Sequence, residues 1–436
     1  MFSAILIKSV NFILDGGNMS TIHVCGGKKL EGSIRIQGSK NASLPVLAAT
    51  LLTEGTNVFE NCPQITDVKE MLEILRGLGS KVWTENGKLY VCGPAKLGNK
   101  LDKEHVISMR SSVILLGVLL SENGSVCMEY PGGCVIGKRP IDMHISSLEK
   151  LGCRFEKNHN VLCAFTDGIK GTDIYLPFPS VGTTENIILA AVKGKGKTVI
   201  CGAAKEPEII HLCQYLSGCG AKITGAGTDC IHIEGVSKLC ASTYRMPSDR
   251  IVAGTYLMSA VAVKGNVTIK NAPVSEMKAV ISLLETMGAC IKAKEEEILV
   301  TEGLGLKAVD VETMVYPGFP TDLQSPLLVL MSQAEGVGRI KENIYENRFH
   351  IVSELNKMNS QMHIVNNEVI MIGPRRLKGK RVSAKDLRGN AALIMAGLLA
   401  EGETQIFDCQ YVKRGYEDIC RDLRGLGANL YEIEDE

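Results

Sequence analysis

A short apolar pattern with helical spacing, ending in a glycine or asparagine, recurs along the whole chain. One copy runs from Met71 to Gly79, and its last residue has the position of a helix C-cap. Glycine and asparagine tolerate the positive φ angle that such a cap requires. The caps are expected at Gly79, Gly152, Gly220, Gly288, Asn359 and Gly427, which gives a period of about 70 residues.

An earlier apolar helix precedes each copy, and short runs of β-favouring residues such as Thr198-Val199-Ile200 follow the helices. The repeating unit is therefore helix, strand, helix, strand. This unit is a small α/β module, and its period is longer than that of most solenoid repeats. Six modules predict a globular α/β fold. The earlier helices are expected at residues 44–55, 113–124, 187–196, 252–265, 327–336 and 391–402.

The charge balance excludes one broad class of function. Basic and acidic residues number 48 each among 436 residues, so the formal net charge is zero. Nucleic-acid-binding proteins usually carry a basic excess, and we therefore expect no nucleic-acid partner. Any site for anions must be built from a local cluster of cations. The 15 cysteines are irregularly spaced without a Cys-x-x-Cys pair, which predicts free thiols in a reducing cytoplasm and no metal site.

The N-terminal segment from Phe2 to Leu14 is apolar but is interrupted by Lys8. It lacks a small-residue cleavage site and is too short to span a bilayer. We therefore expect a cytoplasmic protein that does not associate with membranes. Residues 1–18 are expected to form an extension outside the fold, with translation starting at Met19. An intact natively expressed species beginning at the first methionine would contradict this expectation.

The ten residues from Pro131 to Pro140 combine one thiol, three glycines and two cations. The glycines would let this loop swing or lie close to a ligand. Lys138 and Arg139 would favour the thiolate form of Cys134, which makes the sulfur a better nucleophile or proton carrier. Taken alone, the segment is also typical of a surface turn that contains an ordinary cysteine.

This loop resembles the catalytic loop of the enolpyruvyl transferases, in particular the branch that acts on UDP-N-acetylglucosamine. The resemblance runs from about Ile22 to about Ile433 and includes several motifs in the order of that family. They are Gly38-Ser39-Lys40-Asn41-Ala42, Ser180-Val181-Gly182, Glu206-Pro207-Glu208, Pro320-Thr321-Asp322, Glu346-Asn347-Arg348-Phe349, Asp386-Leu387-Arg388 and Arg414-Gly415-Tyr416.

The resemblance implies a two-domain, inside-out α/β barrel built from the six repeats, with helices inside, sheets outside and the active site in the cleft between the domains. One domain is expected to be discontinuous, formed by residues 19–39 and 248–436. The other is expected to span residues 40–247 and to carry the Cys134 loop. Helix N-termini directed at the cleft would favour phosphate and carboxylate ligands.

The implied reaction moves the enolpyruvyl group of phosphoenolpyruvate to the 3-hydroxyl of UDP-N-acetylglucosamine and releases phosphate. This is the first committed step of peptidoglycan synthesis, with consequences for cell-wall biogenesis, cell shape and cell division. Phosphoenolpyruvate carries a phosphate and a carboxylate, which arginines bind with bidentate geometry. The implied contacts are Lys40, Arg139 and Arg414 for the phosphate, Arg348 and Arg388 for the carboxylate side, and Asn41.

For the nucleotide sugar, the resemblance points to the residues after the Cys134 loop, to a Ser-Val-Gly turn and to the region of Ile344. Backbone groups and short side chains there would read the uracil and the diphosphate. The implied contacts are Asn41, Arg110, Arg139, Pro140, Ile141, Asp142, Met143, Ser180, Val181, Gly182, Asp322 and Ile344.

The implied catalytic residues are Cys134, Asp322, Lys40 and Arg414. Asp322 would accept or orient the proton of the 3-hydroxyl, although an aspartate after Pro-Thr is also typical of a helix N-terminus. Cys134 would deliver a proton to C3 of phosphoenolpyruvate or form a covalent adduct. Lys40 and the arginines would stabilise the charged intermediate, and closure of the cleft would exclude water. The scheme requires no cofactor and no metal, and it predicts inactivation by fosfomycin through alkylation of Cys134.

Three residues depart from the family pattern. Tyr411 and Lys413 stand where a histidine and an acidic residue are frequent, and Phe178 stands where some members carry a basic residue. None of these changes removes an implied catalytic group, so activity is expected to be kept. The lesser alternative is that the positive charge of Lys413 alters phosphate affinity or product release. We expect a monomer or a weak homo-oligomer.

Two other functions remain open from the sequence. The first is enolpyruvyl transfer to shikimate 3-phosphate, against which the Cys134 loop argues. The second is that of a catalytically retired paralogue, which would bind nucleotide sugar and regulate a partner. Retention of the implied catalytic set argues against the second function, since a binding protein would not need it.

Overall fold

A computed structural model describes residues 20–434 apart from 95, 99–100, 102, 131–135 and 138–139. The expected N-terminal extension, Cys134 and Arg139 lie outside these described residues. The buried apolar side chains of the described part form two clusters. One cluster draws on residues 22–36 and 251–430, and the other on residues 44–246.

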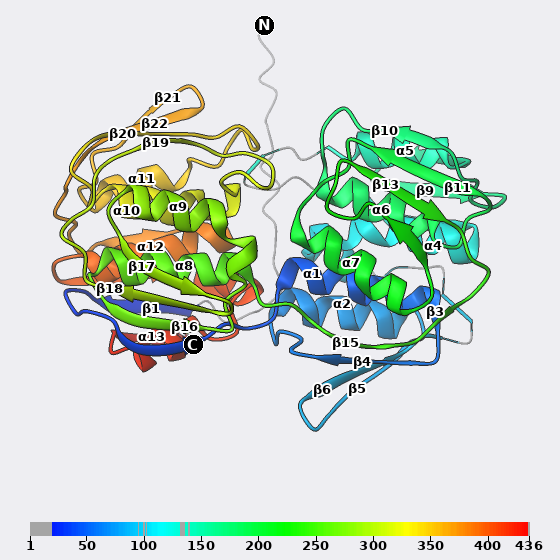
Figure 1. Cartoon of the computed structure of the whole chain (residues 1–436), viewed down its shortest axis with the longest axis horizontal. Coiled ribbons are helices and arrows are strands. Elements are labelled where there is room, and N and C mark those ends of the chain that lie inside the picture. The colour runs from blue at the N-terminus through cyan, green and yellow to red at the C-terminus, as the bar shows by residue number, and fades with distance from the viewer. Residues whose placement is uncertain are drawn as a thin grey trace, which may run out of the picture.

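The elements that carry these clusters form two lobes side by side in Figure 1, with strand β1 (Ser20–Cys25) in the same lobe as the C-terminal half of the chain. The chain passes from one cluster to the other between Ile36 and Leu44, and it returns between Met246 and Ile251. The domain boundaries expected at residues 40 and 248 stay predictions.

Six helices with few exposed residues form the interior of the lobes. Most of their residues are apolar and buried on all sides, because other elements surround them. In α4, for example, every residue from Leu115 to Leu120 is buried. These helices are α1 (Lys40–Ala49), α4 (Leu115–Asn123) and α6 (Val181–Ala191) in one lobe, and α8 (Arg250–Ala262), α10 (Gln324–Met331) and α12 (Leu387–Leu399) in the other.

Six further helices are amphipathic and cover the interior. Helix α2, for example, buries Val68, Met71, Ile74 and Leu75 on one side. The covering helices are α2 (Thr66–Gly77), α5 (Asp142–Lys150), α7 (Pro207–Gly218), α9 (Lys278–Thr286), α11 (Ile351–Lys357) and α13 (Ile419–Gly425).

None of the helices in the described part of the chain is long and apolar enough to cross a membrane.

The residues expected to cap these covering helices lie two positions beyond the last helical residue. All of them have the predicted positive φ angle: 101° at Gly79, 95° at Gly152, 104° at Gly220, 100° at Gly288, 77° at Asn359 and 92° at Gly427. The sixfold helix-end prediction is therefore confirmed.

The strands form small sheets on the outer side of the helices, and their residues alternate between buried and exposed. Most of these sheets contain one parallel pair followed by antiparallel pairs. In the first lobe the strands are β15 (Thr243–Arg245), β4 (Thr56–Glu60), β6 (Lys88–Cys92) and β5 (Lys81–Glu85); β7 (Ser125–Glu129), β9 (Val161–Thr166) and β8 (Cys153–Asn158); β10 (Asp173–Tyr175), β11 (Lys197–Cys201), β13 (Cys230–Glu234) and β12 (Lys222–Thr224); and the pair β14 (Leu239–Cys240) and β3 (Thr53–Glu54).

The second lobe has three four-stranded sheets, and β1 lies inside one of them. Hydrogen bonds to β24 and β25 on either side therefore tie the start of the described chain to its end. The sheets are β17 (Cys290–Lys294), β18 (Glu297–Thr301), β16 (Asn266–Lys270) and β2 (Glu31–Arg35); β19 (Asp310–Glu312), β20 (Gly336–Lys341), β22 (Glu368–Gly373) and β21 (His363–Val365); and β23 (Arg381–Ser383), β24 (Glu403–Phe407), β1 and β25 (Asn429–Glu434).

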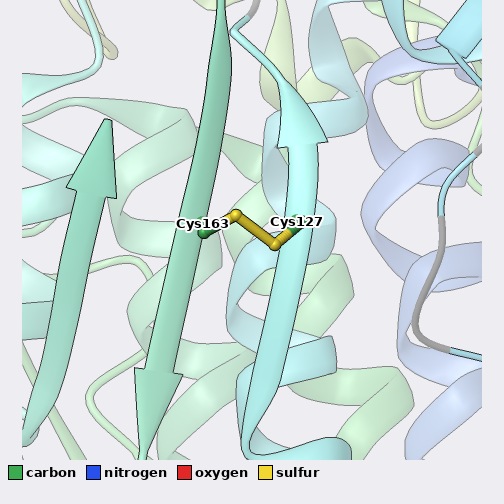
Figure 2. The surroundings of a disulfide bond; sticks show 2 residues. All are labelled: Cys127 and Cys163. Atoms are coloured by element: carbon green, nitrogen blue, oxygen red, sulfur yellow. A yellow bond between two sulfur atoms is a disulfide. The ribbon is translucent and has the colours of Figure 1, made fainter. Parts of the chain in front are cut away.

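One cysteine pair corrects the expectation of free thiols. Cys127 on β7 and Cys163 on β9 are direct partners in the antiparallel register and form a disulfide, as Figure 2 shows. The other cysteines of the described part are free. The two disulfide positions are 36 residues apart and share no recognisable motif, so only the strand register brings them together.

Candidate active site

Asp322 lies in the short 3-10 helix η4 (Thr321–Leu323) that leads into α10, and it binds two arginines. Arg348 donates from Nη2 to Oδ1 at 2.8 Å, and Arg388 donates from Nη2 to Oδ2 at 2.9 Å. The arginine side chains are 3% and 6% exposed, whereas that of Asp322 is 27% exposed. The arginines are therefore fixed in the interior, and the carboxylate is the accessible member of this cluster.

The two guanidinium groups control the charge of Asp322. Burial alone would raise the pKa of this carboxyl, but the charges of Arg388 and Arg348 outweigh burial and hold the pKa well below its usual range. An aspartate in this setting is ionised and is a weak base. Its basicity would rise if another anion took over the hydrogen bonds of the arginines. Nε of Arg348 and Nη1 of Arg388 are buried without a hydrogen-bond partner among the described residues, so two donors remain for such an anion.

A second cluster is centred on Asp67, in the first turn of α2. Lys40, the first residue of α1, places Nζ 2.7 Å from Oδ2 of Asp67. Arg414, the last residue of the 3-10 helix η5 (Cys409–Arg414), donates from Nε to Oδ1 at 2.8 Å and from Nη2 to Oδ2 at 3.2 Å. The sequence analysis did not single out Asp67. Its carboxylate joins a cation from each lobe.

The charges of the Asp67 cluster are interdependent. Burial lowers the pKa of Lys40, and the nearby Arg414 and Arg388 charges lower it further, while Asp67 opposes them. Burial would raise the pKa of Asp67, but Lys40 and Arg414 outweigh burial and lower the pKa. The influence of Arg388 on Lys40 means that the Asp322 and Asp67 clusters are close enough to interact electrostatically. Together they place four cations around two carboxylates.

The starts of three helices also meet in this region. Lys40 begins α1 after the capping residue Ser39, and Arg388 lies in the first turn of α12 after the capping residue Asp386. Asp249 caps α8 and also accepts a hydrogen bond from the backbone N–H of Lys40 at 3.0 Å. Ser39, Asp249 and Asp386 accept hydrogen bonds from N–H groups at these ends, so the positive charge of the region comes mainly from the side-chain cations. A protein with no net charge thus concentrates positive potential at one place.

The residues expected at the nucleotide lie at the starts of two neighbouring helices. Ser180 caps α6, and Val181 and Gly182 are its first residues. Ile141 precedes α5, which begins with Asp142 and Met143, and exposed Pro140 lies just before them. A Cβ on Gly182 would lie only 3.2 Å from Cε1 of His144 in α5. The absence of a side chain at this glycine therefore permits the close approach of the two helix ends.

Asn186 holds these helices against the segment that begins with Arg110. Its Nδ2 donates to the carbonyl of Val113 at 2.9 Å and to Nδ1 of His144 at 2.7 Å, and its Oδ1 accepts from the N–H of Gly117 at 2.8 Å. Arg110 is the first residue of the 3-10 helix η2 (Arg110–Ile114). Sequence reasoning missed Asn186 and His144, because neither lies in a motif that the sequence analysis singled out.

Glu342 connects the remaining expected contacts of the sugar. This buried carboxylate accepts from the N–H of Ile344 and from Oγ1 of Thr321, each at 2.9 Å. Thr321 precedes Asp322, so Ile344 and the Asp322 cluster share one support. Asn41 follows Lys40 in α1 and is half-buried.

Cys134 and Arg139 lie outside the described residues, but the residue Ile136 between them is described. Its carbonyl accepts a hydrogen bond from the N–H of Asn347 at 3.2 Å. Asn347 immediately precedes Arg348 of the Asp322 cluster. The first lobe therefore contacts the second beside one of the predicted arginines, at a point two residues beyond Cys134.

The sequence pattern of the EPSP synthase family (3-phosphoshikimate 1-carboxyvinyltransferase) matches residues 24–423. This chain belongs to that family of enolpyruvyl transferases. The family prediction that rested on the loop and the motifs is thereby confirmed.

Two named relatives of this enolpyruvyl transferase align with nearly the whole chain. The UDP-N-acetylglucosamine 1-carboxyvinyltransferase of Halothermothrix orenii is 43% identical over 416 residues, which cover 95% of this chain and 100% of the relative. The UDP-N-acetylglucosamine 1-carboxyvinyltransferase 2 of Carboxydothermus hydrogenoformans is 42% identical over 412 residues, 94% of this chain and 98% of the relative.

Solved structures of enolpyruvyl transferases share the fold. The enolpyruvyl transferase NikO from Streptomyces tendae matches with a TM-score of 0.88 at 22% identity, covering 96% of this chain and 99% of the other. An EPSP synthase from Acinetobacter baumannii matches with a TM-score of 0.74 at 18% identity, covering 95% and 100%. The prediction of a two-domain α/β fold is confirmed.

The structure also places the three departures from the enolpyruvyl transferase pattern. Lys413 extends its ammonium group to Glu432 on β25, at 2.7 Å. Tyr411 is half-buried, and burial raises the pKa of its hydroxyl, while the nearby Arg414 charge opposes that rise. Phe178 is 41% exposed in the turn before α6. The sequence position of Lys413, beside Arg414, suggested a direct effect of its charge on phosphate binding. The ion pair with Glu432 argues against that effect.

Proposed function

We propose that this enolpyruvyl transferase moves the enolpyruvyl group of phosphoenolpyruvate to the 3-hydroxyl of UDP-N-acetylglucosamine and releases inorganic phosphate, in peptidoglycan synthesis. The observation that carries the proposal is the pair of cation clusters on Asp67 and Asp322. Phosphoenolpyruvate has two anionic groups on a small frame, and two adjoining clusters suit such a ligand. Two relatives above 40% identity bear the name of this activity.

The phosphate of phosphoenolpyruvate binds Lys40 and Arg414 in this proposal, together with Arg139 and the neighbouring Asn41. Arg414 is 32% exposed and can exchange its hydrogen bonds with Asp67 for a phosphate. The carboxylate binds Arg348 and Arg388. These arginines are buried, and Nε of Arg348 and Nη1 of Arg388 have no hydrogen-bond partner among the described residues.

The nucleotide sugar lies along the starts of α5 and α6 and along η2. The peptide groups of Val181 and Gly182 support the uracil or the diphosphate, since helix N-termini favour such acceptors. Arg110, Asp142 and their neighbours complete this side. The sugar reaches the region of Ile344 and Asp322, which Glu342 holds together.

The reaction begins when the sugar 3-hydroxyl oxygen bonds to C2 of phosphoenolpyruvate and gives its proton to Asp322. C3 takes a proton from Cys134, so the double bond becomes a single bond. The tetrahedral adduct then returns a proton from C3 to the Cys134 thiolate, and the C2–C3 double bond re-forms as the C2–O bond to the phosphate breaks. The leaving phosphate takes the proton held by Asp322, which restores both residues. Binding of the substrate carboxylate to Arg348 and Arg388 weakens their hold on Asp322, which raises its basicity when a base is needed.

Release of phosphate from phosphoenolpyruvate tests the assignment, with UDP-N-acetylglucosamine and shikimate 3-phosphate as competing acceptors. Release that requires the amino-sugar nucleotide and is lost in Cys134→Ala supports the proposal. The matched control is Cys290→Ala, which removes an exposed free thiol on β17. Release with shikimate 3-phosphate alone would overturn the acceptor. No release while nucleotide binding is intact would favour a retired paralogue.

The proposal also covers inhibition by fosfomycin, the location and oligomeric state of the protein, and its role in the cell. Fosfomycin alkylates Cys134 in this scheme, so Cys134→Asp is expected to lose drug sensitivity. The protein acts in the cytoplasm as a monomer or weak homo-oligomer and supports cell shape and cell division. Intact mass after fosfomycin treatment, compared between the unmodified protein and Cys134→Ala, tests the alkylation without any activity measurement.

A further inference from the structure

His350 lies at the N-terminal end of α11, and both of its ring nitrogens face groups that can only accept hydrogen bonds. Nδ1 is 3.0 Å from the carbonyl oxygen of Asn347, and Nε2 is 2.8 Å from Oδ2 of Asp386. A neutral imidazole has one N–H and could satisfy only one of these acceptors. The pair of contacts therefore fits an imidazolium ring that donates from both nitrogens.

The two partners of His350 belong to different parts of the candidate site. Oδ1 of Asp386 accepts from the N–H groups of Arg388 and Gly389 at 3.0 and 2.9 Å, which fixes the start of α12. The side chain of Arg388 in turn holds Asp322. One ring therefore supports the segment before Arg348 on one side and the helix that carries Arg388 on the other.

The same ring also supports a contact between the lobes. The residue whose carbonyl faces Nδ1 of His350 is Asn347, and the N–H of Asn347 donates to the carbonyl of Ile136 in the first lobe. A shift of this peptide would change both the cross-lobe hydrogen bond and the position of the adjacent Arg348. The contacts thus connect the protonation of His350 to the arginines of the Asp322 cluster.

The surroundings of His350 have opposite effects on its pKa. Burial lowers the pKa of His350 and so does the Arg348 charge, while Asp386 and the Asn347 carbonyl raise it, and the net direction is upward. On α11 itself, Glu354 is engaged by Lys357 and by the N–H of Ser383 from β23. The positive form of His350 is therefore favoured more than in an unperturbed histidine.

We propose that His350 is a positioning residue for the anion-binding arginines, and that loss of its positive charge weakens use of phosphoenolpyruvate as pH rises. The inference rests on the proposed function. It assigns His350 no contact with the substrate. The pKa of His350 in the folded protein is raised above its unfolded value. The contribution of its positive charge is therefore complete below about pH 6.5 and is lost as pH rises through the folded-state pKa.

The test compares pH profiles of kcat/KM for phosphoenolpyruvate in the unmodified protein, His350→Gln and His350→Arg. Glutamine is neutral and should lower kcat/KM about tenfold at pH 6.5, the equivalent of one charge-assisted hydrogen bond. The ratio of unmodified to glutamine activity should then shrink as pH rises. Arginine remains charged, so His350→Arg should restore part of the activity. The ratio of arginine to glutamine activity should not fall as the charge of His350 is lost with rising pH. His363→Gln, on an exposed residue of β21, is the control and should match the unmodified protein.

A ratio that stays constant with pH would overturn the proposal, because a merely structural histidine predicts that result. NMR titration of the His350 ring provides a second readout that needs neither activity nor a folded variant. A ring pKa above about 6.5 with both nitrogens protonated below it supports the inference, and a lower value contradicts it. If UDP-N-acetylglucosamine elicits no phosphate release, the proposed function fails, while the titration still decides the charge of His350.

Discussion

The Asp67 and Asp322 clusters have the same arrangement of charges but opposite exposure. In each, one carboxylate lies between two cations. Around Asp322 the arginines are buried and the acid is 27% exposed, whereas around Asp67 the acid is 4% exposed and Arg414 is 32% exposed. The accessible group is therefore the base candidate in one cluster and a cation in the other.

The clusters also differ in where their members come from. Asp322, Arg348 and Arg388 all belong to the second lobe, so this cluster can form within one folded unit. The Asp67 cluster takes Arg414 from the second lobe and its other members from the first, and it depends on how the lobes meet. We infer that the Asp322 cluster is a fixed platform and that the Asp67 cluster is an exchangeable one.

The largest effect is expected from Asp322→Asn, which keeps the shape of the side chain and removes the base. We expect kcat to fall on the order of 10³-fold, as is typical when a general base is lost. The measurement is phosphate release at saturating concentrations of both substrates. Thermal unfolding serves as the control, because the variant also leaves two buried arginines without their anion. A fall in kcat of less than about tenfold would mean that Asp322 only orients the acceptor.

The next largest effect distinguishes the two clusters and comes from substitutions that replace one arginine in each with lysine. Arg388→Lys removes a planar donor from a buried site, and kcat/KM for phosphoenolpyruvate should fall about 100-fold, since lysine cannot reproduce its paired hydrogen bonds. Arg414→Lys changes a partly exposed cation and should cost about tenfold. Steady-state kinetics with phosphoenolpyruvate as the varied substrate measures both. Equal losses would contradict the distinction between a fixed and an exchangeable cluster.

The sequence predicted the parts of this arrangement that are encoded locally. The helix ends at Gly79 and Asn359 need a positive φ, and that need is visible in the residue itself. The arginines lie within short motifs that resemble those of the family. The expected contacts at Ser180 and Gly182 likewise follow from one contiguous turn at the start of a helix.

The parts that the sequence did not predict depend on long-range packing. Asp67 looks like an ordinary acidic residue in a first helical turn, and its partner Arg414 is 347 positions away. Asn186 lies in a buried helix, where its polar side chain has no motif to identify it, yet it holds three segments together. The Cys127–Cys163 disulfide depends on the register of two strands. Such partnerships are fixed only when the elements pack.

A smaller and pH-dependent effect is expected from Asp67→Asn. Burial and nearby arginines already lower the pKa of Lys40, and Asp67 is the group that opposes them. Without its charge the pKa of Lys40 should fall further, so the protonated amine needed for phosphate binding would be lost at a lower pH. We expect kcat/KM for phosphoenolpyruvate to fall about tenfold on the alkaline side of the pH profile, where one charged hydrogen bond is missing, and less on the acid side. A pH profile compared with that of the unmodified protein measures this shift, and an unmoved alkaline limb would contradict it.

The smallest effect is expected from Lys413→Ala, beside Arg414 in the chain. Lys413 is 45% exposed and forms a 2.7 Å ion pair with Glu432 on β25, and such pairs contribute about 0–1 kcal/mol. Its removal should change the KM for phosphoenolpyruvate by less than about twofold, because this charge is engaged by the sheet. Arg414→Ala, measured alongside, should raise the same KM far more. If both variants raise it equally, the positive charge of Lys413 also acts on the phosphate, and the exchangeable cluster has a third cation that is absent from the usual family pattern.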